Sequence, residues 1–203
     1  MLAPVGGERA VNATVAAKRA LRLRVSEARA AVPPGEREAL GAVLCERLLA
    51  LPEVAGAAVV AAYVGVGTEP PTTVLLSTLA ARGVTVLLPV LEADASLSWG
   101  VHSGTLVPGR LGLLSPPSAG AALAGADVVV VPGVAFDAAG RRLGRGGGSY
   151  DRALRGVTVP VVAAVRDEEV VAEVPVEPHD RPVDVVVTPT RVLRPGTTEP
   201  GAR

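Results

Sequence analysis

The chain has 203 residues, of which 49% are hydrophobic and 2% aromatic, and its formal net charge is zero. This length suits one domain, and the balanced charge with so few aromatic residues argues against a nucleic-acid-binding surface. The sequence lacks both the roughly 18 consecutive apolar residues of a membrane span and a secretory signal, and the single Cys45 cannot form an internal disulfide. We therefore expect a cytoplasmic protein that neither enters a membrane nor binds nucleic acid. We also expect a monomer, although the oligomeric state does not follow from these features.

The first quarter of the chain is predicted to be mainly helical. Residues 1–11 are small and mixed, and we expect them to be disordered. Strong helix formers with a loose apolar stripe predict a helix over 12–31, which Pro33-Pro34-Gly35 ends. Apolar residues at helical spacing predict a second helix over 36–49, with Cys45 as a buried thiol on it, and the apolar run 57–64 is typical of a buried strand.

The rest of the chain alternates between short helices and apolar strands. The predicted elements are helices over 72–82, from Ser149 and over 167–173; strands over 84–88, 97–101, 128–131, 159–165 and 183–187; a loop over 102–118; and a helical turn within 119–125. Thr72 or Thr73 is expected to cap its helix, and Pro89 to end the strand before it. Continuous apolar strands between helices indicate one α/β domain over 12–193, a three-layer α/β/α fold with a mainly parallel sheet. Residues 194–203 are expected to form a disordered tail.

The most informative motif follows the apolar run 128–131. Residues 132–152 read PGVAFDAAGRRLGRGGGSYDR and combine a glycine cluster with several arginines. Glycines allow the backbone to direct several N–H groups at one anion, and arginines add fixed positive charge. This combination favours a phosphate-binding loop at the carboxyl end of a strand, although a glycine-rich surface turn is the simpler alternative.

Two common phosphate-binding motifs are absent from this loop. The chain has no GxxxxGK[ST] sequence, which excludes a P-loop NTPase. A GxGxxG fingerprint would need glycine at position 149, where the chain has Ser149, which argues against a Rossmann cofactor site. His102 and His179 lack the spacing of a zinc site.

The segment VPGVAFDAAGRRLGRGGGSYDR resembles the signature of the 5-formyltetrahydrofolate cyclo-ligase family, also called methenyltetrahydrofolate synthetases. Other landmarks follow in the family's order over roughly residues 16–190: Lys18 and Arg22, then Tyr63, Glu69 and Thr72, then Leu88-Pro89-Val90, and finally His179-Asp180 with the VDVVVT run. Two positions depart from the family pattern. Ser149 stands where the family has a tyrosine, and Ser115 where it often has a glutamate.

The resemblance implies an enzyme that uses ATP and Mg²⁺ to convert 5-formyltetrahydrofolate, with or without a polyglutamate tail, into 5,10-methenyltetrahydrofolate. It implies that ATP is bound by Lys18, Arg22, Arg142, Leu143, Gly144, Arg145, Gly146, Gly147, Gly148, Ser149 and Tyr150, with Arg145 and Tyr150 in catalytic roles. The folate would contact Glu69, Trp99, Arg145 and residues 146–149, with Glu69 accepting hydrogen bonds from the pterin edge. Asp151 and Asp180 would bind Mg²⁺.

The residues taken one by one allow simpler interpretations. Lys18 and Arg22 lie four apart on one helical face, where they can reach one triphosphate or form an ordinary solvated surface. Asp151 can cap a helix, Glu69 can be an exposed loop charge, and Trp99 can be a core residue. Two other functions therefore stay open: a non-catalytic folate- or nucleotide-binding protein of the same fold, and a sugar-phosphate isomerase-like enzyme that needs no ATP.

Overall fold

The computed structural model describes residues 6–177 and 180–196, and it is organised around a seven-stranded sheet. The strand order is β11 (Val192–Leu193), β10 (Val185–Val187), β9 (Val161–Ala164), β6 (Val128–Val131), β1 (Val59–Ala61), β2 (Thr85–Leu91) and β3 (Leu97–Val101). The strands from β10 to β2 are parallel, and the edge strands β11 and β3 run antiparallel to their neighbours. The predicted α/β fold with a mainly parallel sheet is confirmed.

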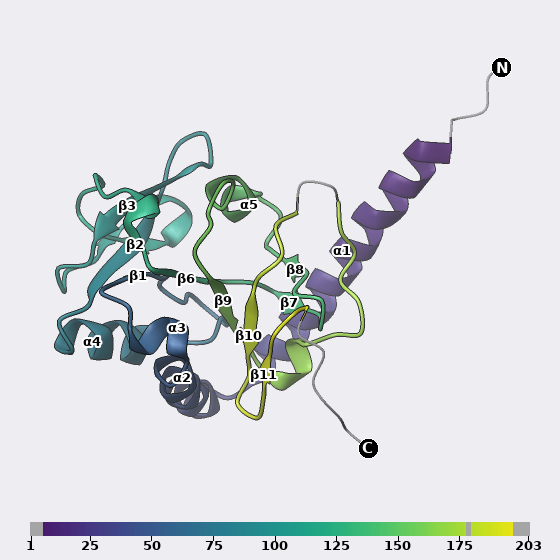
Figure 1. Cartoon of the computed structure of the whole chain (residues 1–203). Helices are drawn as coiled ribbons and strands as arrows, with labels where there is room; N and C mark the ends of the chain where they lie inside the picture. The colour runs from purple at the N-terminus through teal and green to yellow at the C-terminus, as the bar shows by residue number, and fades with distance from the viewer. Residues whose placement is uncertain (1–5, 178–179, 197–203) are drawn as a thin grey trace.

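The central strands are buried on both faces, as continuous apolar runs predict. β6 directs Val128 and Val130 into one core, and Val129 and Val131 into the other. Helices α2 (Pro34–Leu49), α3 (Pro52–Ala55) and α4 (Thr73–Ala81) cover the first face (Figure 1). The opposite face has only the short helix α5 (Ser149–Ala153), with loops and the small sheet of β7 (Ala135–Phe136) and β8 (Arg142–Leu143), so this layer is thinner than expected.

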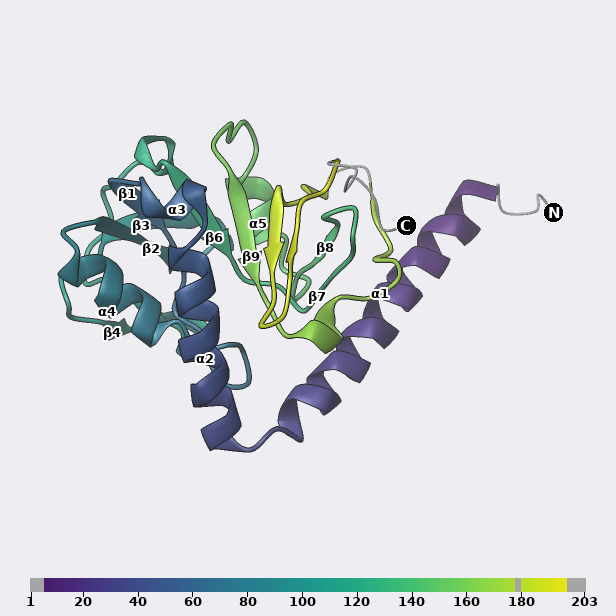
Figure 2. The same cartoon turned by 60° about the horizontal axis from the view of Figure 1, so that its bottom comes forward.

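Helix α1 (Gly6–Ala30) lies apart from the other helices. Figure 2 shows α1 and α2 diverging like the arms of a V, with the start of α1 projecting from the body. The second half of α1 packs Leu21 and Val25 against Ala135, Leu143 and Val174. α1 begins earlier than the predicted start at residue 12, and residues 1–5 of the segment expected to be disordered lie outside the described residues.

The proline in β2 does not end the strand, contrary to the prediction. β2 continues to Leu91, and Pro89 lies opposite Trp99 of β3. His102 N donates to Val86 O, and Glu92 N donates to Ser96 O. In the antiparallel pair of β2 and β3, the hydrogen-bonded residue pairs therefore lie at alternate positions, counted from Val86. Pro89 falls between them, where its missing N–H faces away from β3, and β1 pairs with β2 only as far as Leu87.

Several predicted segments are more irregular or more ordered than expected. The loop over 102–118 contains the paired strands β4 (Val107–Pro108) and β5 (Leu114–Ser115) and the 3₁₀ turn η1 (Arg110–Gly112). The turn within 119–125 is reduced to η2 (Leu123–Gly125), and the helix over 167–173 to η3 (Asp167–Glu169). Thr72 precedes α4 but does not cap it, because its hydroxyl oxygen accepts from Gly65 N instead of a helix N–H, while the hydroxyl donates to Tyr63 O.

Cys45 is buried on α2 as predicted, and burial raises the pKa of its thiol. Arg194, in the segment expected to be disordered, forms an ion pair with Glu53, while residues 197–203 lie outside the described part. None of the described helices is both long enough and apolar enough to cross a membrane. The single domain over 12–193 stays a prediction.

Candidate active site

A cavity of about 530 Å³ lies at the carboxyl ends of three neighbouring parallel strands. Tyr63 and Val64 follow β1, the end of β2 supplies residues 89–91, and Pro132 and Gly133 follow β6. Parallel strands end at the same edge of a sheet, so the residues after them meet there. The remaining walls are residues Lys18 and Arg22 of α1, Glu69, Leu97 of β3, the hairpin residues 109–111 and 113–115, residues 142–151, and Glu177 with Asp180.

The glycine-rich loop forms one wall of the cavity between β8 and α5. Gly146 has a φ of 103° and Gly148 a φ of 65°, which side chains with a Cβ rarely adopt. A Cβ on Gly144 would approach Arg142 Nη1 to 3.0 Å. The loop therefore depends on glycine both for its backbone angles and for the space beside Arg142, and its backbone lines the cavity as the sequence predicted.

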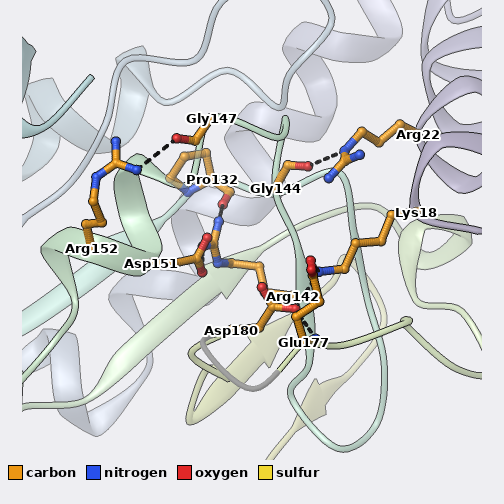
Figure 3. Close-up of polar contacts among 10 residues, drawn as sticks. All are labelled: Lys18, Arg22, Pro132, Arg142, Gly144, Gly147, Asp151, Arg152, Glu177 and Asp180. Carbon is orange, nitrogen blue, oxygen red and sulfur yellow. Dashed lines mark hydrogen bonds and ion pairs between the residues drawn. The ribbon is translucent and has the colours of Figure 1, made fainter. Parts of the chain in front are cut away.

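Lys18 and Arg22 reach this loop region from the same face of α1 (Figure 3). Lys18 is buried, and its Nζ lies 2.7 Å from Glu177 Oε2 and 2.6 Å from Asp180 Oδ2. Burial lowers the pKa of Lys18, but hydrogen bonds and ion pairs with these two carboxylates outweigh it and raise the pKa above its ordinary value. Arg22 Nε donates to Gly144 O at 2.8 Å.

Arg142 lies on strand β8 and not in the loop itself, which corrects the predicted placement. Its side chain is 3% exposed, and Nη2 lies 2.5 Å from Asp151 Oδ1. Nη1 donates to Pro132 O at 3.4 Å (Figure 3). The guanidinium carbon lies 5.8 Å from the centre of the Tyr150 ring. Arg142 thus connects the end of β6, the loop and α5, and its Nε has no hydrogen-bond partner among the described residues.

Glu69 and Arg145 face each other across the cavity. Arg145 Nε lies 2.9 Å from Glu69 Oε1, and the Glu69 side chain is 8% exposed. The second oxygen, Oε2, accepts a hydrogen bond from Val66 N, and Glu69 N donates to Val66 O. Glu69 is therefore a buried, oriented carboxylate, which excludes the interpretation of an exposed loop charge.

The opposite wall of the cavity is apolar, and the sequence did not reveal it. It is formed by Val90, Leu91, Leu97, Leu111, Leu113 and Leu114. Leu111 is 87% exposed and has a φ of 55°, which is unusual for a non-glycine residue. The repeated leucines inside this Gly/Pro-rich segment were the sequence signal that could have indicated an apolar wall, because a loop that only connects two strands does not need them. Ser115, noted above as a departure from the family pattern, is buried at the edge of this wall.

Comparison with known proteins decides the family. Residues 14–189 match the profile of the 5-formyltetrahydrofolate cyclo-ligase family. The 5-formyltetrahydrofolate cyclo-ligase of Mycolicibacterium smegmatis is 42% identical over 185 residues, which cover 86% of this chain and 94% of that protein. The chain belongs to the 5-formyltetrahydrofolate cyclo-ligase family.

Two further relatives agree with this assignment. The Escherichia coli cyclo-ligase is 35% identical over 179 residues, which cover 83% of this chain and 98% of that protein. The NMR structure of Aquifex aeolicus 5,10-methenyltetrahydrofolate synthetase matches with a TM-score of 0.80 and 31% identity, and the match covers 92% of this chain and 96% of that chain. The recognition made from the loop motif is confirmed, and the cyclo-ligase fold accounts for the parallel sheet.

Tyr150 and Trp99 have different places in the cyclo-ligase cavity. Tyr150 lines it, and its hydroxyl is buried with no hydrogen-bond partner among the described residues. Burial raises the pKa of this phenol, which favours the protonated form, so the hydroxyl can donate a hydrogen bond. Trp99 is buried in the core, outside the cavity lining, and packs edge-on against Tyr150 at 6.5 Å. The structure therefore does not place Trp99 in position to contact folate directly.

The predicted magnesium ligands both line the cavity, and each is paired with a cation. Asp151 pairs with Arg142, and Asp180 with Lys18. Within residues 6–177 and 180–196, no three metal-ligating side chains gather into one group. Mg²⁺ commonly uses one or two carboxylates with phosphate oxygens and water, so this donor set fits a metal that arrives with a polyphosphate. His179 lies outside the described residues.

Proposed function

We propose that this cyclo-ligase uses ATP to convert 5-formyltetrahydrofolate into 5,10-methenyltetrahydrofolate, releasing ADP and phosphate. The observation that carries the proposal is the two-sided cavity. One side has the glycine loop with Lys18, Arg22 and Arg142, which suits a triphosphate, and the other has an apolar wall with Glu69 at hydrogen-bonding distance from a guanidinium. A small sugar phosphate needs neither the basic residues of α1 nor an apolar wall of this extent.

The chemistry explains why both halves are needed. The formyl group on N5 is an amide, and its oxygen is a poor leaving group. The formyl oxygen attacks the γ-phosphorus of ATP, the bond to the β-phosphate oxygen breaks, and ADP leaves. N10 then attacks the activated carbon, the carbon–oxygen bond breaks, and phosphate leaves as the five-membered ring closes. N10 also loses its proton as the methenyl product forms.

The chain's own residues position these groups. Lys18, Arg22, Arg142 and the N–H groups of 144–149 would neutralise the triphosphate, and the transferring phosphoryl group is stabilised mainly by such placed charge. Glu69 would accept hydrogen bonds from the N–H groups of the pterin, and the Tyr150 hydroxyl would donate a hydrogen bond to the substrate. The leucine wall would cover the rest of the folate and exclude water. Mg²⁺, when held by Asp151 and Asp180, would screen the phosphate charges.

The test is spectrophotometric. The purified protein, 5-formyltetrahydrofolate and Mg²⁺ should give the methenyl absorbance only when ATP is added. Tight folate binding without turnover would favour the non-catalytic alternative, and the absence of any folate effect would favour the sugar-phosphate alternative. A cytoplasmic location, a monomeric state and the use of polyglutamylated folate stay predictions.

The metal assignment has a separate test. Asp151→Asn should weaken Mg²⁺-dependent binding of a non-hydrolysable ATP analogue, measured by calorimetry, because the carboxylate charge is lost. Glu38→Gln is the matched control, since Glu38 is exposed on α2 and does not line the cavity. Equal Mg²⁺ dependence in the Asp151 variant and wild type would contradict the assignment.

A further inference from the structure

The ion pair between Glu69 and Arg145 joins the two halves of the cavity. Arg145 belongs to the glycine loop, which is the proposed nucleotide side, and Glu69 lies on the segment after β1, which is the proposed pterin side. Arg145 Nε lies 2.9 Å from Glu69 Oε1, so each group is the other's ion-pair partner. In the free protein, a folate N–H must compete with a guanidinium for this carboxylate.

The two partners differ in how firmly the protein holds them. Glu69 is fixed by its own turn, because Oε2 accepts from Val66 N and the main chain of Glu69 donates back to Val66. Arg145 is flanked in the sequence by Gly144 and Gly146, and its side chain is 59% exposed. Its ion pair with Glu69 is the salt bridge that holds it among the described residues. Arg145 can therefore move while Glu69 keeps its orientation.

We propose that the Glu69–Arg145 pair couples the binding of the two substrates. Nucleotide phosphate draws Arg145 away from Glu69, and the released carboxylate then accepts the pterin N–H groups. A buried carboxylate that has lost its ion-pair partner is unfavourable, so the nucleotide complex gains from the arrival of a folate N–H donor at Oε1. Binding free energies are reciprocal, so folate tightens nucleotide binding by the same factor. This inference rests on the proposed function.

Lys18, Arg22 and Arg142 would not serve this role. Lys18 and Arg142 pair with Glu177, Asp180 and Asp151, all of which lie on the proposed phosphate and metal side. Arg22 donates to the Gly144 carbonyl. Only the contact of Arg145 with Glu69, among the cavity ion pairs of the described residues, crosses from one substrate side to the other.

The test measures binding, not turnover. Calorimetry gives the Kd of 5-formyltetrahydrofolate for the wild-type protein with and without a non-hydrolysable ATP analogue and Mg²⁺. The analogue should lower this Kd about fivefold or more. The Arg145→Gln variant should bind folate more tightly than wild type in the absence of nucleotide, because Glu69 is already released, and the analogue should no longer change its folate Kd.

Arg152→Gln is the matched control. Arg152 is a nearby arginine whose guanidinium donates to the carbonyls of Gly147 and Ala95 and not to Glu69, so its variant should keep the wild-type coupling. An unchanged wild-type folate Kd with the analogue, or weaker nucleotide-free folate binding by Arg145→Gln, would overturn the inference. If wild type still forms the methenyl product in either case, the proposed function stands. If wild type neither binds folate nor forms product, both fail.

Discussion

Replacing Glu169 by alanine is expected to destabilise the protein by about 3–5 kcal/mol, the usual cost of leaving one partner of a buried ion pair alone. The pair joins Arg29 of α1 to Glu169 of η3, and the two side chains are 5% and 3% exposed. Arg29 Nε lies 2.7 Å from Oε1, and Nη2 lies 2.8 Å from Oε2. This geometry is bidentate and nearly free of solvent.

The magnitude follows from what the variant leaves behind. Burial lowers the pKa of Arg29, but the hydrogen bonds and charge of Glu169 outweigh this and raise it, so the guanidinium stays charged in the interior. Without Glu169, the guanidinium keeps the hydrogen bond from Nη2 to Gly133 O at 2.8 Å as its remaining partner among residues 6–177 and 180–196. One carbonyl cannot replace a carboxylate, and Gly133 itself lines the active-site cavity.

The assay is urea or thermal unfolding followed by circular dichroism. For a protein of this size, the expected loss lowers Tm by about 6–20 °C. Glu168→Ala is the control, because Glu168 is the neighbouring residue but is exposed, and its variant should stay within about 0.5 kcal/mol of wild type. A loss below about 1 kcal/mol for Glu169→Ala would refute the reasoning. The double variant Arg29→Met, Glu169→Leu should recover much of the stability, because no buried charge is left unpaired.

Three further predictions concern the cavity and the C-terminal segment. Arg145→Ala should raise KM for ATP or lower kcat at least about tenfold, equivalent to about 1.4 kcal/mol, in the absorbance assay; unchanged kinetics would contradict the loop assignment. Tyr150→Phe should leave the unfolding free energy nearly unchanged, because the hydroxyl has no hydrogen-bond partner among the described residues. The same variant should lower kcat/KM about twofold to tenfold, and equal activity would show that the hydroxyl donates nothing to substrate. Glu53→Gln should cost about 0.5–1 kcal/mol at neutral pH, since solvent screens the partly exposed Arg194. The hydrogen bond from Arg194 lowers the pKa of Glu53 below its ordinary 4.5, so this stabilisation is present above pH 4.5 and is lost as the pH falls through the lowered pKa. A wild-type-minus-variant difference that persisted in acid would contradict this.

The order of elements was predictable because it depends on local patterns. The run 128–131 is apolar throughout, and it forms a strand with those bounds. The strand over 97–101 and the start of α5 at Ser149 also match the predictions. The predictions failed where pairing partners decide the outcome. Pro89 is tolerated because the sheet places it opposite Trp99 with its nitrogen unpaired, and no local pattern shows that.

The sequence by itself determined the family and the chemical character of the site, since the glycine loop, its arginines and the residues Lys18 and Glu69 can be recognised from the amino-acid sequence alone. Only the tertiary structure decided how these charges are partnered. Arg145 meets Glu69, and Lys18 meets Asp180, across 76 and 162 positions of sequence. Such contacts arise because segments that follow the parallel strands meet at one edge of the sheet and α1 packs beside them, and that geometry depends on the packing of the whole chain.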